Sequence, residues 1–246
     1  MQQHLKQAGR FLCFLFLTVV SAGICHAAGE DQLITTAKTK DGDVVPYVLN
    51  TVSAAPRYVI ILFPGSTGVM DPHMEDGHVV YREKNNFLIR ARPLIVDDEF
   101  ATVATNSSSS EQRIQALIDD IKSRFPGAKI YLMGTSRGTY DTMALAGYLS
   151  DKIAGEIHTS SLQAIATFNA KKYANRQLIV HHKDDECRAT PFSAAQWSHN
   201  HYGNDFIAVD GGTSAGDPCE PFSYHGYNGI EKPTIDAIKA WIKQGT

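Results

Sequence analysis

A serine between two glycines is the first feature of this sequence that could carry out chemistry. Residues 134–138 read Gly-Thr-Ser-Arg-Gly and match the pattern Gly-x-Ser-x-Gly. A serine hydroxyl is a weak nucleophile until a sharp turn presents it to a base, and glycines let a strand and a helix approach closely around such a turn. The pattern predicts that Ser136 is a nucleophile; the alternative is a small residue in a tight strand–helix turn.

A second match shows that the pattern alone is weak evidence. Residues 212–216 read Gly-Thr-Ser-Ala-Gly, so Ser214 satisfies it equally well. A strand-forming run precedes Ser136 and a helix-forming stretch follows it, whereas Asp-Pro-Cys follows the second match and begins no helix. We therefore assign the nucleophile to Ser136 and expect Ser214 to be an ordinary loop residue.

The elements that must position Ser136 alternate along the chain between strand patterns and helix patterns. This alternation predicts a largely parallel sheet, on which ligand sites form beyond the carboxyl ends of the strands. Thr234 is the expected N-cap of the last helix. The predicted strands are residues 32–37, 44–49, 58–63, 101–105, 129–133, 153–159, 178–182 and 206–209, and the predicted helices are 110–125, 137–149 and 234–243, with a broken helix in 86–100 that contains Pro93.

With Ser136 between such a strand and such a helix, the chain resembles the α/β-hydrolase family. The resemblance implies a mostly parallel central sheet, helices on both of its faces, and the chain order serine, acid, histidine. A lid over the site would be minimal or absent, because only residues 155–172 could form a small cap. The resemblance places the acid after the second strand beyond the nucleophile and the histidine after the last strand.

The two remaining members of a catalytic triad can be sought at those places. Asp185 stands at the matching spacing after the predicted strand at 178–182, and Asp184 and Glu186 are alternatives on the same loop. His225 is the histidine downstream of the last predicted strand. The resemblance thus implies that His225 is the base and that Asp185 orients it; an acidic surface loop and a surface histidine are the alternatives.

The resemblance also implies two backbone N–H donors for the oxyanion of acyl transfer. One donor belongs to the residue after the nucleophile, here Arg137. The other belongs to the loop at residues 64–68, which reads Pro-Gly-Ser-Thr-Gly and points to Ser66, with Thr67 as the alternative. Pro64 stands where many relatives carry a histidine, so this loop departs from the commonest form, and a plain glycine-rich turn is the other interpretation.

The first 27 residues have the pattern of a signal peptide. Lys6 and Arg10 precede an apolar run at residues 11–20, and small residues lead to a cleavage site after Ala27. This run is shorter than the roughly 20 residues that span a bilayer, although an uncleaved anchor is the alternative. We expect residues 1–27 to be removed on export to the periplasm or the cell exterior, and residues 28–246 to form a single domain without stable membrane insertion.

Two cysteines remain after residue 27, Cys187 and Cys219. In an exported protein such a pair predicts one disulfide, and two free thiols are the alternative. Because Cys187 follows Asp185 by two residues and Cys219 precedes His225 by six, the bond would tie the acid loop to the base loop.

Composition and the other histidines exclude several function classes. The net charge of −3 predicts no nucleic-acid or anionic-membrane partner. No histidine spacing matches a strong zinc signature, so we expect no metal and no cofactor. His181 and His182 should point to opposite faces of a strand, so one of them could line the site. His199 and His201, which could be combined with Asp205 into a metal site, are expected instead to lie on solvated loops. The cluster in the loop after Gly68 is expected at the surface; it comprises His73, Glu75, Asp76 and His78.

The resemblance implies a function as well as a fold. It implies hydrolysis of a carboxylic ester, thioester or lactone through an acyl-enzyme on Ser136, with a small-molecule ester as partner and without a cofactor. An acyltransferase would use the same residues, and an exported binding module could keep the fold without turnover.

Overall fold

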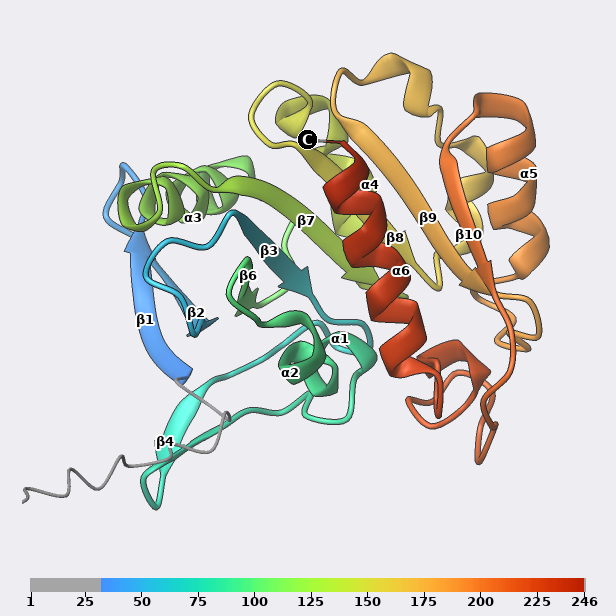
Figure 1. The fold of residues 1–246 in the computed structure, drawn as a ribbon, viewed down its shortest axis with the longest axis horizontal. Helices are drawn as coiled ribbons and strands as arrows, with labels where there is room; N and C mark the ends of the chain where they lie inside the picture. Colours follow the sequence, from blue (N-terminus) through green and yellow to red (C-terminus); the bar gives the residue numbers. More distant parts are fainter. Residues whose placement is uncertain (1–31, 246) are drawn as a thin grey trace, which may run out of the picture.

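An eight-stranded sheet organises residues 32–245, the part of the chain that the computed structural model describes (Figure 1). The predicted signal peptide, residues 1–27, lies outside these residues. The strands are β1 (Gln32–Lys38), β2 (Val44–Asn50), β3 (Tyr58–Phe63), β6 (Phe100–Thr105), β7 (Lys129–Thr135), β8 (Gly155–Thr159), β9 (Arg176–His182) and β10 (Asp205–Val209).

The strand order is β1-β2-β6-β3-β7-β8-β9-β10. β1 and β2 form an antiparallel hairpin, and β2 also runs antiparallel to β6. Every other neighbouring pair is parallel. The carboxyl ends of β3, β7, β8, β9 and β10 therefore meet along one edge of the sheet, which confirms the predicted mostly parallel architecture.

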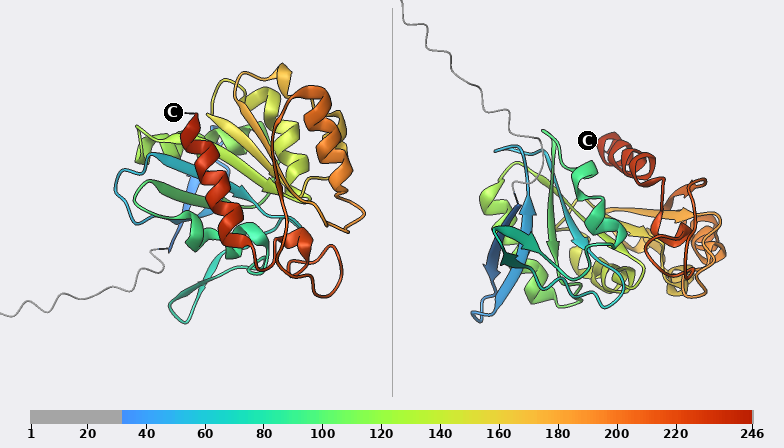
Figure 2. Two further views of the ribbon diagram at one scale, coloured as in Figure 1. Left: turned by 45° about the vertical axis from the view of Figure 1, so that its right-hand side comes forward. Right: turned by 90° about the horizontal axis from the view of Figure 1, so that it is seen from below.

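Helices cover both faces of the sheet because the central strands are apolar on both sides. All six residues of β3 are buried, and they alternate between two cores. One core includes α1 (Phe87–Arg90), α2 (Arg92–Ile95) and α6 (Glu231–Gln244). Across the sheet lie α3 (Glu111–Arg124), α4 (Gly138–Leu149) and α5 (Phe192–Tyr202), and Figure 2 shows α6 and α3 on opposite sides.

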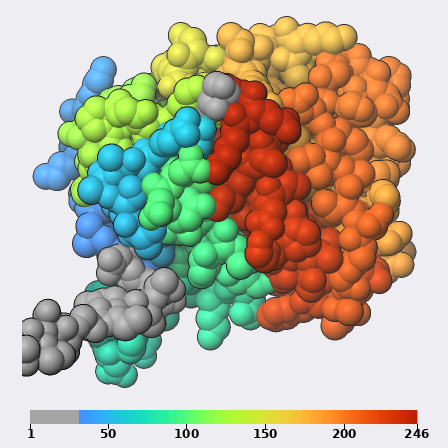
Figure 3. Space-filling model, in the orientation of Figure 1, coloured from blue at the N-terminus to red at the C-terminus, as the bar shows by residue number. Residues whose placement is uncertain are grey.

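The last helix closes one face of the molecule. In the space-filling view α6 lies across this face, between the segments around residues 50–100 and those around residues 200–210 (Figure 3). Its buried side chains are Thr234, Ile235, Ile238, Trp241 and Ile242. The predicted N-cap at Thr234 is wrong: the helix begins at Glu231, and the Thr234 hydroxyl lies inside it and donates to the carbonyl of Ile230 at 2.8 Å.

The structure corrects the sequence analysis in three further segments. The broken helix of residues 86–100 divides into α1 and α2 at Ala91, with Pro93 in the first turn of α2, and Phe100 already belongs to β6. The polar segment after Gly68 forms a separate hairpin of β4 (His73–Glu75) and β5 (His78–Val80). Residues 192–202 form α5, so His199 and His201 lie on a helix and not on a loop as predicted.

The region proposed as a small cap has little independent structure. Within residues 155–172, β8 belongs to the central sheet, and two short 3-10 helices follow it at Gln163–Thr167 and Ala170–Lys172. Side chains of the first 3-10 helix share a small core with α5. Within residues 32–245, no helix is long and apolar enough to cross a membrane.

Candidate active site

Ser136 lies on a strained turn between β7 and α4. Its φ angle is 51°, in the left-handed region that non-glycine residues seldom adopt. The flanking glycines permit this turn: a Cβ at Gly134 would lie 2.6 Å from the carbonyl oxygen of Gly138, and one at Gly138 would lie 2.4 Å from that of Phe63. Only glycines allow β7, α4 and the end of β3 to pack this closely, as the Gly-x-Ser-x-Gly chemistry requires.

Ser214 has a different setting although it satisfies the same pattern. It is exposed in the long loop after β10, and no helix follows it. The φ angle of Ser214 is not positive, unlike that of Ser136. The context that separated Ser136 from Ser214 in the sequence is therefore present in the structure.

Asp185 and His225 form a buried hydrogen-bonded pair. His225 Nδ1 lies 3.0 Å from Asp185 Oδ2, and both side chains are nearly inaccessible to solvent. The loop after β9 orients the carboxylate, because Asp185 Oδ1 accepts from the backbone N–H of Cys187 at 2.9 Å. The Thr190 hydroxyl donates to Asp185 Oδ2 at 3.0 Å and lies 3.0 Å from His225 Nδ1. The carboxylate is thus held against the imidazole.

The charge of Asp185 is strongly favoured in this setting. Burial acts to raise the pKa of the Asp185 carboxyl, but hydrogen bonds and charge interactions from His181 and His225 outweigh it and lower that pKa well below its ordinary value. The alternatives in the same loop differ, since Asp184 and Glu186 are exposed and neither carboxylate contacts His225 within the described residues.

Three contacts fix the segment that carries His225. The backbone N–H of His225 donates to the Ser223 hydroxyl at 3.2 Å, and its carbonyl accepts from the Ser160 hydroxyl at 2.7 Å. Tyr227 adds a third, because its hydroxyl donates to the carbonyl of Val180 at 2.9 Å. The first bond orders the loop after β10 internally, and the bonds with Ser160 and Val180 attach this loop to the carboxyl ends of β8 and β9.

The loop after β3 offers free backbone donors beside Ser136. Ser66 has a φ of 54°, and a Cβ at the preceding Gly65 would lie 2.9 Å from the Cβ of Ser136. Among residues 32–245, no acceptor pairs with the backbone N–H of Ser66, Thr67 or Arg137. Donors that are unpaired within the protein are available to a developing oxyanion.

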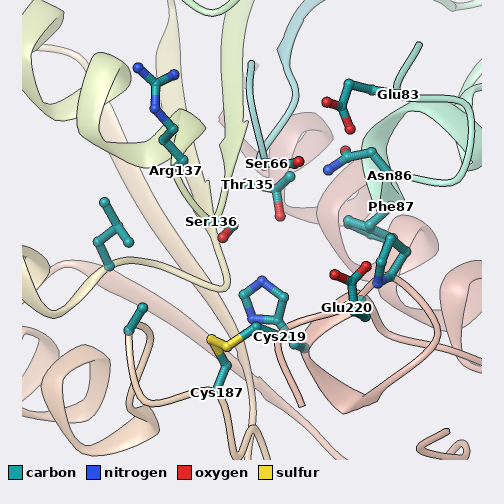
Figure 4. Close-up of a pocket in the computed structure, with 15 residues that line it drawn as sticks. Ser66, Glu83, Asn86, Phe87, Thr135, Ser136, Arg137, Cys187, Cys219 and Glu220 are labelled. Atoms are coloured by element: carbon teal, nitrogen blue, oxygen red, sulfur yellow. A yellow bond between two sulfur atoms is a disulfide. The ribbon is translucent and has the colours of Figure 1, made fainter. Parts of the chain in front are cut away.

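These groups surround one pocket of about 290 Å³. Ser66, Ser136, Arg137 and His225 line it, although they come from three separate loops. Figure 4 shows Ser136 near its centre, between Thr135 and the disulfide, while the guanidinium of Arg137 points away from it. The remaining lining residues are Glu83, Asn86, Phe87, Thr135, Leu162, Cys187, Ala189, Cys219, Glu220, Pro221 and Gly226.

Cys187 and Cys219 form a disulfide, as the cysteine count predicts. The bond joins the acid loop after β9 to the base loop after β10, across 32 residues of sequence. Both cysteines also line the pocket, so the bond forms part of its wall. It thereby restricts the segments that carry Asp185 and His225 relative to each other.

Known proteins match this chain in fold but not in sequence. No family model and no curated protein matches the sequence. The fold resembles an α/β serine hydrolase without a lid from Xanthomonas campestris, with a TM-score of 0.60, 11% identity, and coverage of 85% of this chain and 94% of that chain. Est1E from Butyrivibrio proteoclasticus gives a TM-score of 0.60 at 17% identity, with 86% and 98% of the two chains covered.

A third match is the esterase domain of a Rhodothermus marinus protein, with a TM-score of 0.61, 10% identity, and coverage of 87% and 99%. In all three comparisons the match covers almost the whole length of the neighbouring structure. This chain has the α/β-hydrolase fold. Its central sheet is an eight-stranded mixed sheet, and the predicted minimal lid agrees with the lidless neighbour.

Within this α/β-hydrolase fold, the histidines other than His225 that the sequence analysis considered lie outside the pocket. His181 does not line the pocket but lies 3.2 Å from Asp185 Oδ2. His182 lies on the other side of β9 and contacts the carbonyl of Gly211 at 2.9 Å. His199 and His201 contact carbonyl oxygens near the end of α5. The cluster on the β4–β5 hairpin is exposed and lines no part of the pocket; it comprises His73, Glu75, Asp76 and His78.

One group of possible metal ligands includes the hydrogen-bonded pair Asp185 and His225. Asp185, Cys187 and His225 place their ligand atoms within 4.8 Å of one another. The sulfur of Cys187 is bonded to Cys219 and is not a thiolate, so it does not supply the ligand that such a site would need. The cluster therefore gives no support to a metal site.

Sequence reasoning missed three residues that the α/β-hydrolase fold brings to the site. Thr190 contacts both Asp185 and His225, and Asn86 and Glu83 come from the segment before α1 to line the pocket. Asn86 carried one local signal, because an asparagine before the apolar run at residues 87–89 is a common helix N-cap. Its place in the pocket has no local signal, since about 50 residues separate it from Ser136.

Proposed function

We propose that this chain is an exported serine hydrolase that cleaves a carboxylic ester through an acyl-enzyme on Ser136. The observation that carries the proposal is the shared pocket of Ser136 and His225, with His225 hydrogen-bonded to Asp185 at 3.0 Å. The strained backbone at Ser136 supports it, because such conformations concentrate at functional sites. The serine hydrolase and esterase neighbours support the same reaction class through their fold.

The acid–base pair determines which nitrogen of His225 can act. Nδ1 faces Asp185, so this nitrogen carries the proton and donates it to the carboxylate. Nε2 is then unprotonated and can accept the proton of the Ser136 hydroxyl. As Ser136 Oγ forms a bond to the carbonyl carbon, the proton moves to His225, and Asp185 stabilises the resulting imidazolium.

The oxyanion and the leaving group complete the first half of the reaction. The electron pair of the carbonyl π bond moves onto oxygen, where the N–H groups of Ser66 and Arg137 would stabilise it, with Thr67 as the alternative to Ser66. When this intermediate collapses, the bond to the alcohol oxygen breaks and His225 returns its proton to that oxygen. Water then repeats the sequence on the acyl-enzyme and restores Ser136.

The size and openness of the site favour a small ester. A cavity of about 290 Å³ lies at the low end of ligand-site volumes, and it is lined by both polar and apolar groups. Est1E, a neighbour at 17% identity, has been solved with ferulic acid bound. We propose a small-molecule carboxylic ester as the substrate; thioesters and lactones would use the same groups.

Export is part of the proposal. The Cys187–Cys219 disulfide supports it, because disulfides persist in oxidising compartments. The signal-peptide pattern at residues 1–27 supports it from the sequence. N-terminal sequencing of the protein recovered from periplasmic and culture fractions tests it: a new terminus after Ala27 is expected, and a retained cytoplasmic Met1 would contradict it.

Labelling by a fluorophosphonate probe tests the reaction class. The wild-type protein should be labelled, Ser136→Ala should not, and Ser214→Ala, which changes the other Gly-x-Ser-x-Gly serine, should be labelled at the wild-type rate. A series of p-nitrophenyl esters from acetate to octanoate then tests ester cleavage, and we expect the short chains to react fastest. Folded wild-type protein that resists labelling would overturn the proposal in favour of a binding module. Preferential transfer to an added alcohol over water would identify an acyltransferase.

A further inference from the structure

Asn86 is held rigidly at the edge of the pocket. Its side-chain Oδ1 accepts a hydrogen bond from the backbone N–H of Leu88 at 3.1 Å and caps α1. Its backbone N–H donates to the carbonyl of Glu83, and its own carbonyl accepts from Ile89 and Arg90. Asn86 retains 8% of its accessible surface and lines the pocket with Ser136. The residue is therefore fixed before any substrate arrives.

The cap decides which way the amide of Asn86 faces. Because Oδ1 is engaged by a donor, the NH₂ group must occupy the opposite side of the amide. Figure 4 shows that this nitrogen points into the pocket, on the side of Ser66 and Thr135. Among residues 32–245 no acceptor pairs with Nδ2, and the atom is not closed off from solvent. Its hydrogens are thus available to a bound molecule.

Gly65 keeps open a space between Asn86 and the serine. A Cβ at Gly65 would lie 3.4 Å from Asn86 Nδ2 and 2.9 Å from the Cβ of Ser136. The same loop carries the unpaired N–H of Ser66, and the unpaired N–H of Arg137 lies directly after Ser136. Three donors without a partner among residues 32–245 therefore lie around the pocket that holds Ser136: the backbone N–H groups of Ser66 and Arg137 and the side-chain Nδ2 of Asn86.

We propose that Asn86 is a catalytic residue whose side-chain Nδ2 donates a third hydrogen bond to the oxyanion formed at Ser136. This inference rests on the proposed serine hydrolase function. As Ser136 Oγ bonds to the carbonyl carbon, the π electrons move to oxygen, and its negative charge grows. The hydrogen bond from Nδ2 strengthens with that charge, so it stabilises the transition state more than the bound ester.

Two substitutions separate the proposed donor from the helix cap. Serine and aspartate cap helices as well as asparagine does, so Asn86→Ser and Asn86→Asp keep the bond to Leu88 and should unfold at the wild-type temperature. Asn86→Ser removes the NH₂ group and should lower kcat about 100-fold with little change in KM. Asn86→Asp places a carboxylate beside the oxyanion and should lower kcat further. Asn85→Ser, the same change at the exposed neighbouring residue, should leave kcat and KM unchanged.

A transition-state analogue provides the second readout. Phenylboronic acid forms a tetrahedral adduct on a reactive serine, and its inhibition constant should rise in Asn86→Ser by a factor similar to the fall in kcat. A kcat within about threefold of wild type in Asn86→Ser, with unchanged inhibition by the boronic acid, would overturn the role of Asn86. That result in an active wild-type enzyme leaves the proposed function intact, whereas wild-type protein without activity or labelling would overturn both.

Discussion

Oδ2 of Asp185 accepts a hydrogen bond from Nδ1 of His225 at 3.0 Å, across 40 residues of sequence. Asp184, the adjacent carboxylate, is exposed and has no contact with His225 within the described residues. The two aspartates therefore form a natural pair of test and control, since the same substitution can be made at both.

Asp185→Asn should lower kcat by about 10⁴-fold, because an amide in place of the carboxylate favours the wrong tautomer of His225 and does not stabilise its protonated form. Asp184→Asn should retain the wild-type kcat. Both are measured with p-nitrophenyl acetate on proteins that show the same circular dichroism. If Asp184→Asn lost activity and Asp185→Asn did not, the assignment of the acid would be wrong.

The disulfide joins the two loops that carry this pair. On the chain-entropy model, closing a loop of 32 residues stabilises the fold by about 3–4 kcal/mol. The double variant Cys187→Ser/Cys219→Ser should lose about this free energy of unfolding in urea and should also have a lower kcat, because the acid and base loops move more freely. Reduction of the wild-type protein should reproduce both effects. A near-native kcat in the double variant would assign the bond to stability alone.

Gly138 separates the first turn of α4 from the end of β3. A Cβ at this position would lie 2.4 Å from the carbonyl oxygen of Phe63, so Gly138→Ala must displace the turn that carries Ser136. We expect a loss of about 1–3 kcal/mol of unfolding free energy and a marked fall in the rate of fluorophosphonate labelling. Gly127→Ala, at a glycine with open space around it, should change neither. Equal behaviour of the two variants would refute this account of the turn.

Glu156 on β8 should make stability depend on pH. Burial raises the pKa of this fully buried carboxyl from 4.5 to about 8. Below pH 4.5 it is protonated in both the folded and the unfolded protein, so it has no effect there. Between pH 4.5 and 8 only the unfolded chain loses the proton, and the free energy of unfolding falls as the pH rises, by the full amount above pH 8.

Glu156→Gln removes this titration. In urea unfolding the variant should match the wild type near pH 4.5 and exceed it by about 2–4 kcal/mol at pH 9. The neighbouring His158 carries the opposite dependence in both proteins, since burial lowers its pKa to about 4 and stability falls as the pH drops from 6.5 to that value. Glu186→Gln, at an exposed carboxylate, is the control. A constant difference between Glu156→Gln and wild type at every pH would contradict the prediction.

Local sequence patterns were sufficient to predict most of the strands and helices of the fold. β3 and β7 are recognisable because strands buried on both faces must be apolar at successive positions, and α6 because its apolar residues recur at helical spacing. α5 escaped detection for the converse reason: its buried residues are the small Ala194, Ala195 and Ser198, which give almost no apolar periodicity. The β4–β5 hairpin is exposed and polar, so it too had no apolar signal.

The sequence by itself determined the order of the chemistry: a serine between two glycines after a buried strand, acids after a later strand, and a histidine before the last helix. Only the tertiary structure decided which carboxylate turns inward, because Asp184 and Asp185 are adjacent and identical in type, and burial beside Thr190 and His181 distinguishes them. It also decided that Asn86 lines the same pocket as Ser136. The helix cap made by Asn86 has a local cause in the sequence. The residues opposite Asn86 across the pocket are set by the packing of strands that are distant in the sequence, and no local sequence pattern predicts this packing.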